Sequence, residues 1–338
     1  MKVLISFINH KSKPQDPKRL VGIFDLKKKK LIKWLDLSVC GQYDDVVHAT
    51  GMCYKDNQLY IGLIPSRYRL TGKLFSTNIK SGQCCMNELR LTKGIHGICN
   101  YNGDIILANS CQNDLITALT VRDGNIICED VFFDLLENQH SGMRSSSKYD
   151  FNDWPDSDDN YHNNSVITDS KGDVWISSFF SYLEYPWKIE KRQNKTKVNT
   201  IEKLGMPKGI VANISNNPPL IHTGYKMPHT VYFDHKGDML HCESKTFRVW
   251  HSRYGACYCD GYTRGICEDV PNNGYWVGLS AYRQGRRDGS ETIMGDLKGA
   301  KVVFVDYNME KRIGWEWDMS EFGLEIFDII PFKSGVYK

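Results

Sequence analysis

Two side chains that could act together on a substrate, an imidazole and a carboxylate, lie near the ends of the segment 227–244, MPHTVYFDHKGDMLHCES. His229 could act as a base, and both His229 and Glu243 could bind a divalent metal. Apolar and polar residues alternate on both sides of DHKGD, where Gly237 permits a tight turn, so the segment is predicted to be a β-hairpin. A hairpin brings its outer ends together, and His229 is therefore expected to lie near Glu243.

The same pattern recurs along the chain. A polar residue, a strand-like run, a Gly-Asp turn and a second run are found in 94–110, GIHGICNYNGDIILANS, and in 161–179, YHNNSVITDSKGDVWISSF. The pattern is weaker in 47–63 and 263–280, and only its first run is found in 324–332. The six first runs begin at His48, His96, His162, His229, Arg264 and Glu325. Repeats of this kind with strand signals predict a β-propeller or another repeat architecture.

The N-terminal segment supplies the strands that the sixth unit lacks, because 2–8, 19–26 and 29–37 have the pattern of three successive strands. We therefore predict an all-β fold, a single six-bladed β-propeller of four-stranded blades over 1–338. One blade would combine 1–37 with 324–332, which closes the ring and leaves no free sheet edge. The hydrophobic content of 41% and charged content of 25% are typical of an ordinary globular protein.

In a propeller, the first strand of every blade lines the central channel, and all first strands run in the same direction. The six residues that begin these strands, called here the mouth residues, are thus expected to form a ring at one mouth of the channel. The second strands return to the same face. The ends of the second strands are expected to place four polar residues beside the ring: Asn109, Ser178, Glu243 and Ser280. Further polar residues at or just beyond such strand ends are expected to join them: Arg67, Asn113, Arg283, Asn9 and His10.

Four imidazoles crowded together raise the free energy of protonating each one, and a divalent cation or an anionic ligand relieves this. We predict a divalent metal, Mn, Fe, Zn or Ni, because imidazole with carboxylate suits these ions, whereas Ca requires more oxygen ligands. The predicted ligands are His48, His96, His162, His229 and Glu325. Alternatively, each histidine only forms a hydrogen bond to the backbone of a neighbouring blade. It would then recur because the repeat recurs, without a function of its own.

The arginines predict a small anionic substrate, because their forked donors suit carboxylate or phosphate. The predicted chemistry is proton abstraction next to a carbonyl, as in β-elimination or epimerisation of a uronate or other sugar acid. The predicted catalytic residues are His229, Glu243 and Arg264, and the predicted substrate-binding residues are Arg67, Asn109, Arg283, Tyr282 and His10. Lactone or ester hydrolysis would use the same groups. A non-catalytic binding propeller and a redox enzyme with bound iron are further alternatives.

Other features limit the partners. Two long polar segments, 138–161 and 282–300, are predicted to cover this face as lids, the first alternatively being disordered. There is no phosphate-binding glycine loop, which predicts no nucleotide cofactor. The net charge of +3 does not indicate nucleic-acid binding. No signal peptide or run of ~18 apolar residues is found, and 11 cysteines in such a chain suggest a reducing compartment, so we expect a cytoplasmic protein without a membrane partner. The cysteines lack the paired CxxC spacing of a zinc site.

The unit PHTVYFDHKGDMLHCES resembles the repeat of the streptogramin (virginiamycin B) lyase group, in which Pro-His opens a strand and the next strand ends in Glu. Gluconolactonase and regucalcin-like propellers are wider relatives. The resemblance implies a propeller with a histidine base and a metal that polarises an ester, roles that fall to His229 and Glu243. The chain departs from this pattern at the second-strand ends 109, 178 and 280, where Asn or Ser replaces Glu. Arg264 has no obvious counterpart in the pattern either, so streptogramin cleavage itself is not expected.

Overall fold

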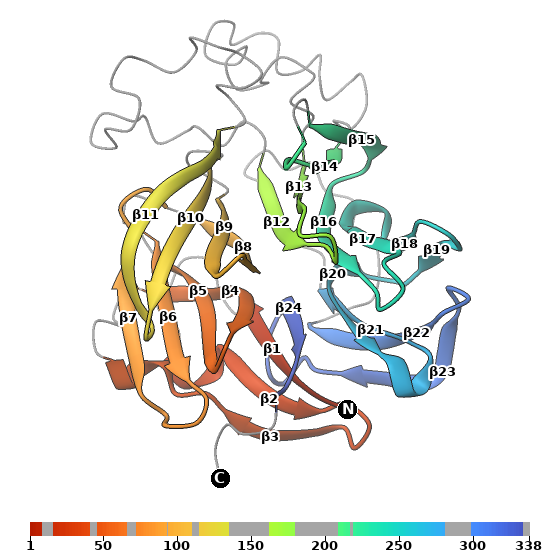
Figure 1. The fold of residues 1–338 in the computed structure, drawn as a ribbon. Helices are drawn as coiled ribbons and strands as arrows, with labels where there is room; N and C mark the ends of the chain where they lie inside the picture. Colours follow the sequence, from red (N-terminus) through yellow and green to blue (C-terminus); the bar gives the residue numbers. More distant parts are fainter. Residues whose placement is uncertain are drawn as a thin grey trace, which may run out of the picture.

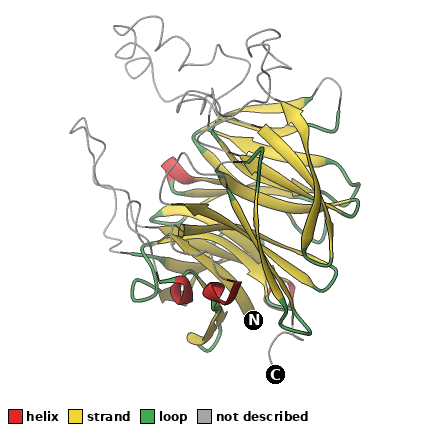
Figure 2. Cartoon of the chain, turned by 90° about the vertical axis from the view of Figure 1, so that its left-hand side faces the viewer, coloured by secondary structure: helices red, strands yellow, loops and turns green. Residues whose placement is uncertain are grey.

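The computed structural model describes residues 1–8, 16–40, 46–65, 72–92, 94–109, 115–134, 162–179, 209–216, 219–280 and 299–333. These residues are almost all in β-strands and turns (Figure 2). The helical segments among them are short 3-10 turns: η1 (Pro17–Arg19), η2 (Leu37–Cys40), η3 (Ser244–Thr246) and η4 (Val270–Asn272). No helix in these ranges is long and apolar enough to cross a membrane.

Sixteen of the strands form four antiparallel sheets of four strands. The first contains β8 (Ile95–Tyr101), β9 (Asp104–Asn109), β10 (Leu115–Arg122) and β11 (Asn125–Asp134). The second contains β12 (Asn163–Thr168), β13 (Val174–Ser178), β14 (Gly209–Asn213) and β15 (Leu220–Tyr225). The third contains β16 (Pro228–Phe233), β17 (Met239–Glu243), β18 (Arg248–His251) and β19 (Gly255–Tyr258). The fourth contains β20 (Tyr262–Asp269), β21 (Gly274–Ser280), β22 (Lys301–Asp306) and β23 (Lys311–Asp318).

The fifth sheet has eight strands and contains both ends of the chain. Its strands are β1 (Lys2–Ile8), β2 (Val21–Asp25), β3 (Lys30–Trp34), β4 (Val46–Lys55), β5 (Gln58–Pro65), β6 (Lys73–Asn78), β7 (Cys84–Glu88) and β24 (Glu325–Pro331). The C-terminal strand β24 is antiparallel to β1, from Val3 opposite Pro331 to Ile8 opposite Glu325. Strand β1 pairs with β4 at Ile8 and His48, and Ser6 Oγ of β1 donates to the Thr50 carbonyl of β4 at 2.7 Å.

The strands that lie innermost in the molecule are β4, β8, β12, β16, β20 and β24 (Figure 1). Each of these inner strands contacts the next one, and β24 contacts β4. Apolar clusters fill the space between sheets; for example, Ile106 and Ile116 pack with Ile176 and Ile210. The predicted all-β class with four-stranded antiparallel sheets is confirmed, and the arrangement is consistent with a β-propeller.

The inner strands contain β-bulges close to the mouth residues. In β8, Ile95 is opposite Asn109 but Gly97 is opposite Ala108, so His96 is an extra residue. In β24, Phe327 is the extra residue. Bulges turn side chains away from the regular alternation and often lie beside functional sites. They accompany a close approach of the inner strands: a Cβ on Gly97 would lie 2.5 Å from the Val166 nitrogen.

Side-chain hydrogen bonds link successive inner strands. The Val231 N–H donates to Ser165 Oγ at 3.1 Å, which joins β16 to β12. The Gly265 N–H donates to Thr230 Oγ1 at 2.9 Å, which joins β20 to β16. At the junction of the two chain ends, the Met52 N–H donates to Asp328 Oδ2 at 2.9 Å. These bonds satisfy backbone donors left unpaired by the bulges, and so fix the strands that carry the mouth residues.

Candidate functional site

The mouth residues lie within two residues of the beginnings of the inner strands. Two of the imidazoles contact one apolar ring, and a third contacts one of these two. His96 and His229 each lie edge-on to Phe327, with 5.3 Å between ring centroids in both cases. His162 contacts His96, also at 5.3 Å. Phe327 is buried and lies in the bulge of β24. An aromatic side chain that was not predicted from the sequence therefore lies between two imidazoles that were.

A second aromatic residue that was not predicted, Phe179, lies between His162 and His229. It stacks on His162, with centroids 4.5 Å apart, and lies 6.1 Å from His229. The backbone of His162 has a positive φ of 55°, which is uncommon for a residue with a Cβ, and the Asn164 amide supports it by donating to the His162 carbonyl. The aromatic neighbours and the turn thus fix where this imidazole lies.

Arg264 is buried and held on three sides. Its guanidinium lies 5.1 Å from the centre of the Tyr262 ring and 5.3 Å from that of Phe327, and its NH1 lies 3.4 Å from Glu325 Oε2. Ring faces attract guanidinium groups, and the ion pair offsets the free energy of burying both charges. Glu325, predicted as a metal ligand, is therefore the ion-pair partner of Arg264.

His48 is buried and belongs to the same end of the inner strands. Glu325 and His48 both pair with Ile8, one from each side of β1. Their side chains thus leave the sheet on the same face, at a separation of two strand spacings, or about 10 Å.

The hairpin at 227–244 is present, but its side chains do not have the expected arrangement. Glu243 pairs with Pro228, and the bulge that follows puts His229 on the opposite face of the sheet. Glu243 accepts hydrogen bonds from the Thr246 hydroxyl at 2.9 Å and the Lys226 N–H at 3.4 Å. Within the described residues its carboxylate therefore stabilises the turn into η3, and the expected side-chain pair with His229 is not formed.

The ends of the second strands have structural contacts. Ser178 Oγ donates to Asn163 Oδ1 at 2.5 Å, and Ser280 Oγ donates to the Ile326 carbonyl at 3.1 Å. Asn109 ends β9, but its side chain is not described. The remaining predicted residues lie outside the described ranges: Asn9, His10, Arg67, Asn113, Tyr282, Arg283 and the segments 138–161 and 282–298.

Among the described residues, the mouth residues are not the ones whose metal-ligating side chains gather most closely. Two groups of three metal-ligating side chains have ligand atoms within 4.8 Å of one another in the described ranges: Asp234, Asp238 and His251, and Asp234, His235 and Glu268. Neither group includes a mouth residue. The imidazoles of His96, His162 and His229 contact aromatic rings, and Glu325 pairs with Arg264. Within the described ranges the predicted ligands therefore form no group of three, and a divalent metal held by them stays a prediction.

In these two groups of ligating side chains, the shared residue Asp234 already accepts hydrogen bonds from the protein. Asp234 Oδ1 accepts from the Lys236 and Asp238 N–H groups, and Oδ2 accepts from the Tyr275 hydroxyl. Burial opposes ionisation of Asp234, but these bonds outweigh it and lower the pKa. His251 Nδ1 accepts from the Arg253 N–H, so the proton is on Nε2, where a metal would require a lone pair. The hydrogen bonds of Asp234 therefore stabilise the turn between β16 and β17.

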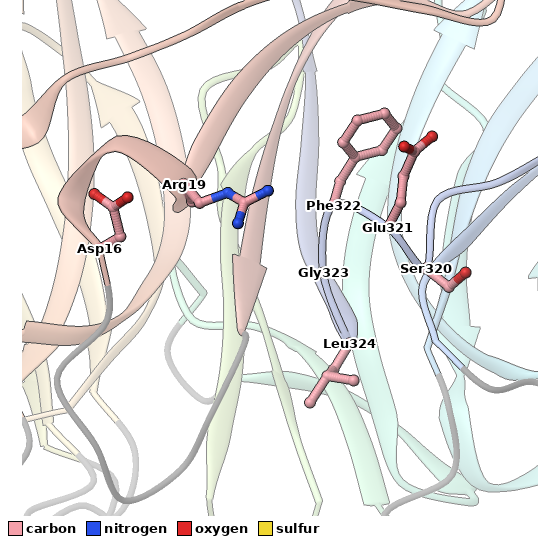
Figure 3. A pocket seen from close by; sticks show the side chains of 7 residues that line it. All are labelled: Asp16, Arg19, Ser320, Glu321, Phe322, Gly323 and Leu324. Atoms are coloured by element: carbon pink, nitrogen blue, oxygen red, sulfur yellow. The ribbon is translucent and has the colours of Figure 1, made fainter.

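A surface hollow of about 290 Å³ lies between η1 and the start of β24 (Figure 3). It is lined by Asp16, Arg19, Ser320, Glu321, Phe322, Gly323 and Leu324. Its charged side chains, Asp16, Arg19 and Glu321, are exposed to solvent. None of the lining residues was predicted, and their mixed charges favour no ligand class.

Solved structures share this architecture. A protein of unknown function from Bacteroides caccae has a TM-score of 0.54 and 10% identity, over 98% of this chain and 99% of that chain. The periplasmic gluconolactonase of Pseudomonas aeruginosa has a TM-score of 0.52 and 12% identity, over 92% and 81%. Catalytically inactive virginiamycin B lyase from Staphylococcus aureus, determined with quinupristin, has a TM-score of 0.45 and 11% identity, over 83% and 73%.

No protein-family model matches the chain, and no curated protein matches its sequence. The predicted resemblance to this group of propellers is confirmed at the level of the fold by the structure named as a periplasmic gluconolactonase. At identities of 10 to 12% the likeness concerns the fold. What the chain does must therefore be argued from its own mouth residues.

Proposed function

We propose that the chain is an enzyme that removes a proton next to the carbonyl group of a small acidic substrate, such as a sugar acid. The observation that carries this proposal is that His96, His229 and Arg264 all contact the buried ring of Phe327. His162 contacts His96, and Glu325 forms an ion pair with Arg264. Imidazoles, whose ring nitrogens can accept or donate a proton, beside a guanidinium that recognises carboxylates, are the groups this chemistry requires.

The proposal depends on a closed ring of inner strands. We infer six blades, with β4–β7 as one blade and β24, β1, β2 and β3 as another, joined through the pairing of Ile8 with His48. The series of contacts between inner strands, from β4 through β24 and back to β4, supports this inference. All mouth residues then lie at one end of a common channel, with Phe327 below them.

The two imidazoles on Phe327 suggest how the reaction proceeds. Arg264, fixed by Tyr262, Phe327 and Glu325, would bind the carboxylate of the substrate. His96 and His229 would then lie on two sides of a substrate placed over Phe327. One imidazole would take the proton from carbon, and the other would return a proton or donate it to a leaving group, which gives epimerisation or β-elimination.

Lactone or ester hydrolysis is the second candidate. It is favoured by the fold shared with the protein named as a gluconolactonase from Pseudomonas aeruginosa. An imidazole would then activate water in place of a C–H group. A divalent metal at the mouth stays a prediction, and no step of the mechanism above requires it.

The test is a turnover assay on uronic and aldonic acids, their esters and their lactones, with products identified by NMR. We expect His96→Gln, His229→Gln and Arg264→Lys each to lower kcat/KM by about 10²-fold or more, with Tm little changed. His222→Gln, in the outer strand β15, is the matched control and should retain full activity. Variants at the mouth that keep full turnover would contradict the assignment, and ligand binding without turnover would favour a binding propeller.

A further inference from the structure

The inner strands approach one another at a position that recurs in each of them. A Cβ on Gly97 would lie 2.7 Å from the Ser165 Cα, and one on Gly265 would lie 3.2 Å from the Asp328 carbonyl carbon. The Gly265 N–H donates to Thr230 Oγ1 at 2.9 Å. The recurring positions are, in chain order, Gly51, Gly97, Ser165, Thr230, Gly265 and Asp328. The residues immediately before them are therefore structurally equivalent.

Asn164 of β12 is one of these equivalent residues. The full set is Thr50, His96, Asn164, His229, Arg264 and Phe327. Four of its members are the side chains that meet at the ring of Phe327. Asn164 is also the extra residue of a bulge, as His96 is in β8 and Phe327 is in β24. It therefore belongs with the side chains of the mouth, although its type and spacing did not single it out in the sequence.

The amide of Asn164 is fixed by two backbone carbonyls. Its Nδ2 donates to the His162 carbonyl at 3.0 Å and to the Pro228 carbonyl at 3.3 Å. Carbonyl oxygens only accept, so the nitrogen has to face them and the orientation of the amide is decided. Oδ1 is left as an acceptor. In the part of the chain that the structure describes, no group donates to it, although the exposed fraction of Asn164 is only 1%.

A buried acceptor without a donor costs free energy, which a ligand regains if it donates a hydrogen bond there. In the proposed reaction Arg264 binds the carboxylate, and the carbon next to it lies between His96 and His229. The strand of Asn164, β12, contacts the strands of both imidazoles, β8 and β16, and lies between them (Figure 1). A hydroxyl group on that carbon is therefore the donor placed to meet Oδ1.

We propose that Asn164 Oδ1 accepts a hydrogen bond from the hydroxyl group next to the carboxylate, so that the mouth selects 2-hydroxy acids. This inference rests on the proposed function, because it names the substrate class of the same site. Oδ1 accepts and cannot donate. An acid with hydrogen or a methoxy group in place of the hydroxyl thus leaves the acceptor unpaired and is rejected.

The test is calorimetric titration of the full chain with gluconate, 2-deoxygluconate and 2-O-methylgluconate. The wild type should bind gluconate at least about tenfold more tightly than either analogue. Asn164→Ala should lose this preference by binding gluconate more weakly, with its affinity for 2-deoxygluconate little changed. Asn87→Ala is the matched control, because it also removes an amide that donates to a carbonyl, but in the outer strand β7, and it should keep the preference.

Equal affinity of the wild type for gluconate and 2-deoxygluconate, or a preference that persists in Asn164→Ala, would overturn the inference. Binding of none of the three acids would overturn it as well. The comparison of acids on the wild type decides the matter even where the variant does not fold. Turnover separates this inference from the proposed function. Preference in binding without proton removal would contradict only the proposed chemistry, whereas proton removal without the preference would contradict only the role of Asn164.

Discussion

His241 shows what complete burial does to a single titratable residue. Its ring lies 4.2 Å from that of Tyr225 and 5.2 Å from that of Trp250, and its exposed fraction is 0%. Within the described ranges neither ring nitrogen has a hydrogen-bond partner. Burial, followed by the nearby His222, lowers the pKa of His241 from 6.5 to about 3. The folded chain therefore keeps this imidazole neutral where an unfolded chain would protonate it.

His241→Phe should remove part of the acid sensitivity of the protein. Because the folded-state pKa is depressed, the stability linked to His241 is complete above pH 6.5 and is lost as pH falls towards about 3. Between neutral pH and about pH 4.5, the free energy of unfolding of the wild type should fall relative to the variant by about 2 to 3 kcal/mol. Urea unfolding at both pH values measures this, and equal pH dependence in both proteins would contradict it.

At the scale of elements, the bulges of the inner strands decide which way the functional side chains project. Alternation and the Gly-Asp turns were sufficient to predict the hairpins and the position of the histidines at strand beginnings. They were not sufficient to predict the opposite faces of His229 and Glu243, since one extra residue reverses the alternation. Phe327 was missed for the same reason, because a bulge turns it from an apolar strand pattern towards the mouth.

Asp328 joins β24 to β4 and makes that junction sensitive to pH. Burial raises its pKa from 3.8 to about 6, although hydrogen bonds from the Met52 and Ile329 N–H groups partly offset this. The folded state thus binds the proton more tightly than the unfolded state. The stability linked to Asp328 is therefore greatest below about pH 4 and is lost as pH rises through about 6.

Asp328→Asn should remove this loss, because the amide oxygen still accepts a backbone hydrogen bond but cannot ionise. Relative to the variant, the wild type should lose up to about 3 kcal/mol between about pH 4 and pH 8. The sign is opposite to that expected for His241, so the same unfolding titration separates the two residues. A wild type that gains stability over this interval relative to Asp328→Asn would contradict the assignment.

At the scale of the whole molecule, the proposed ring brings together residues that are hundreds of positions apart. Phe327 and Glu325 come from the C-terminal strand, and they meet His96, His229 and Arg264 from three other sheets. Repeats in the sequence could predict that such a ring exists. They could not predict which side chains touch, since those contacts depend on how closely the sheets approach and on which aromatic side chains fill the space between them.

The central claim is that this assembled mouth removes a proton next to a carbonyl group. The most direct test is to incubate the protein with uronic and aldonic acids in D2O and to follow deuterium incorporation at the carbon next to the carboxylate by NMR. The account predicts incorporation by the wild type and by His222→Gln, and its loss in His229→Gln and Arg264→Lys. Hydrolysis of a lactone or ester without any incorporation, or incorporation that persists in both mouth variants, would contradict it.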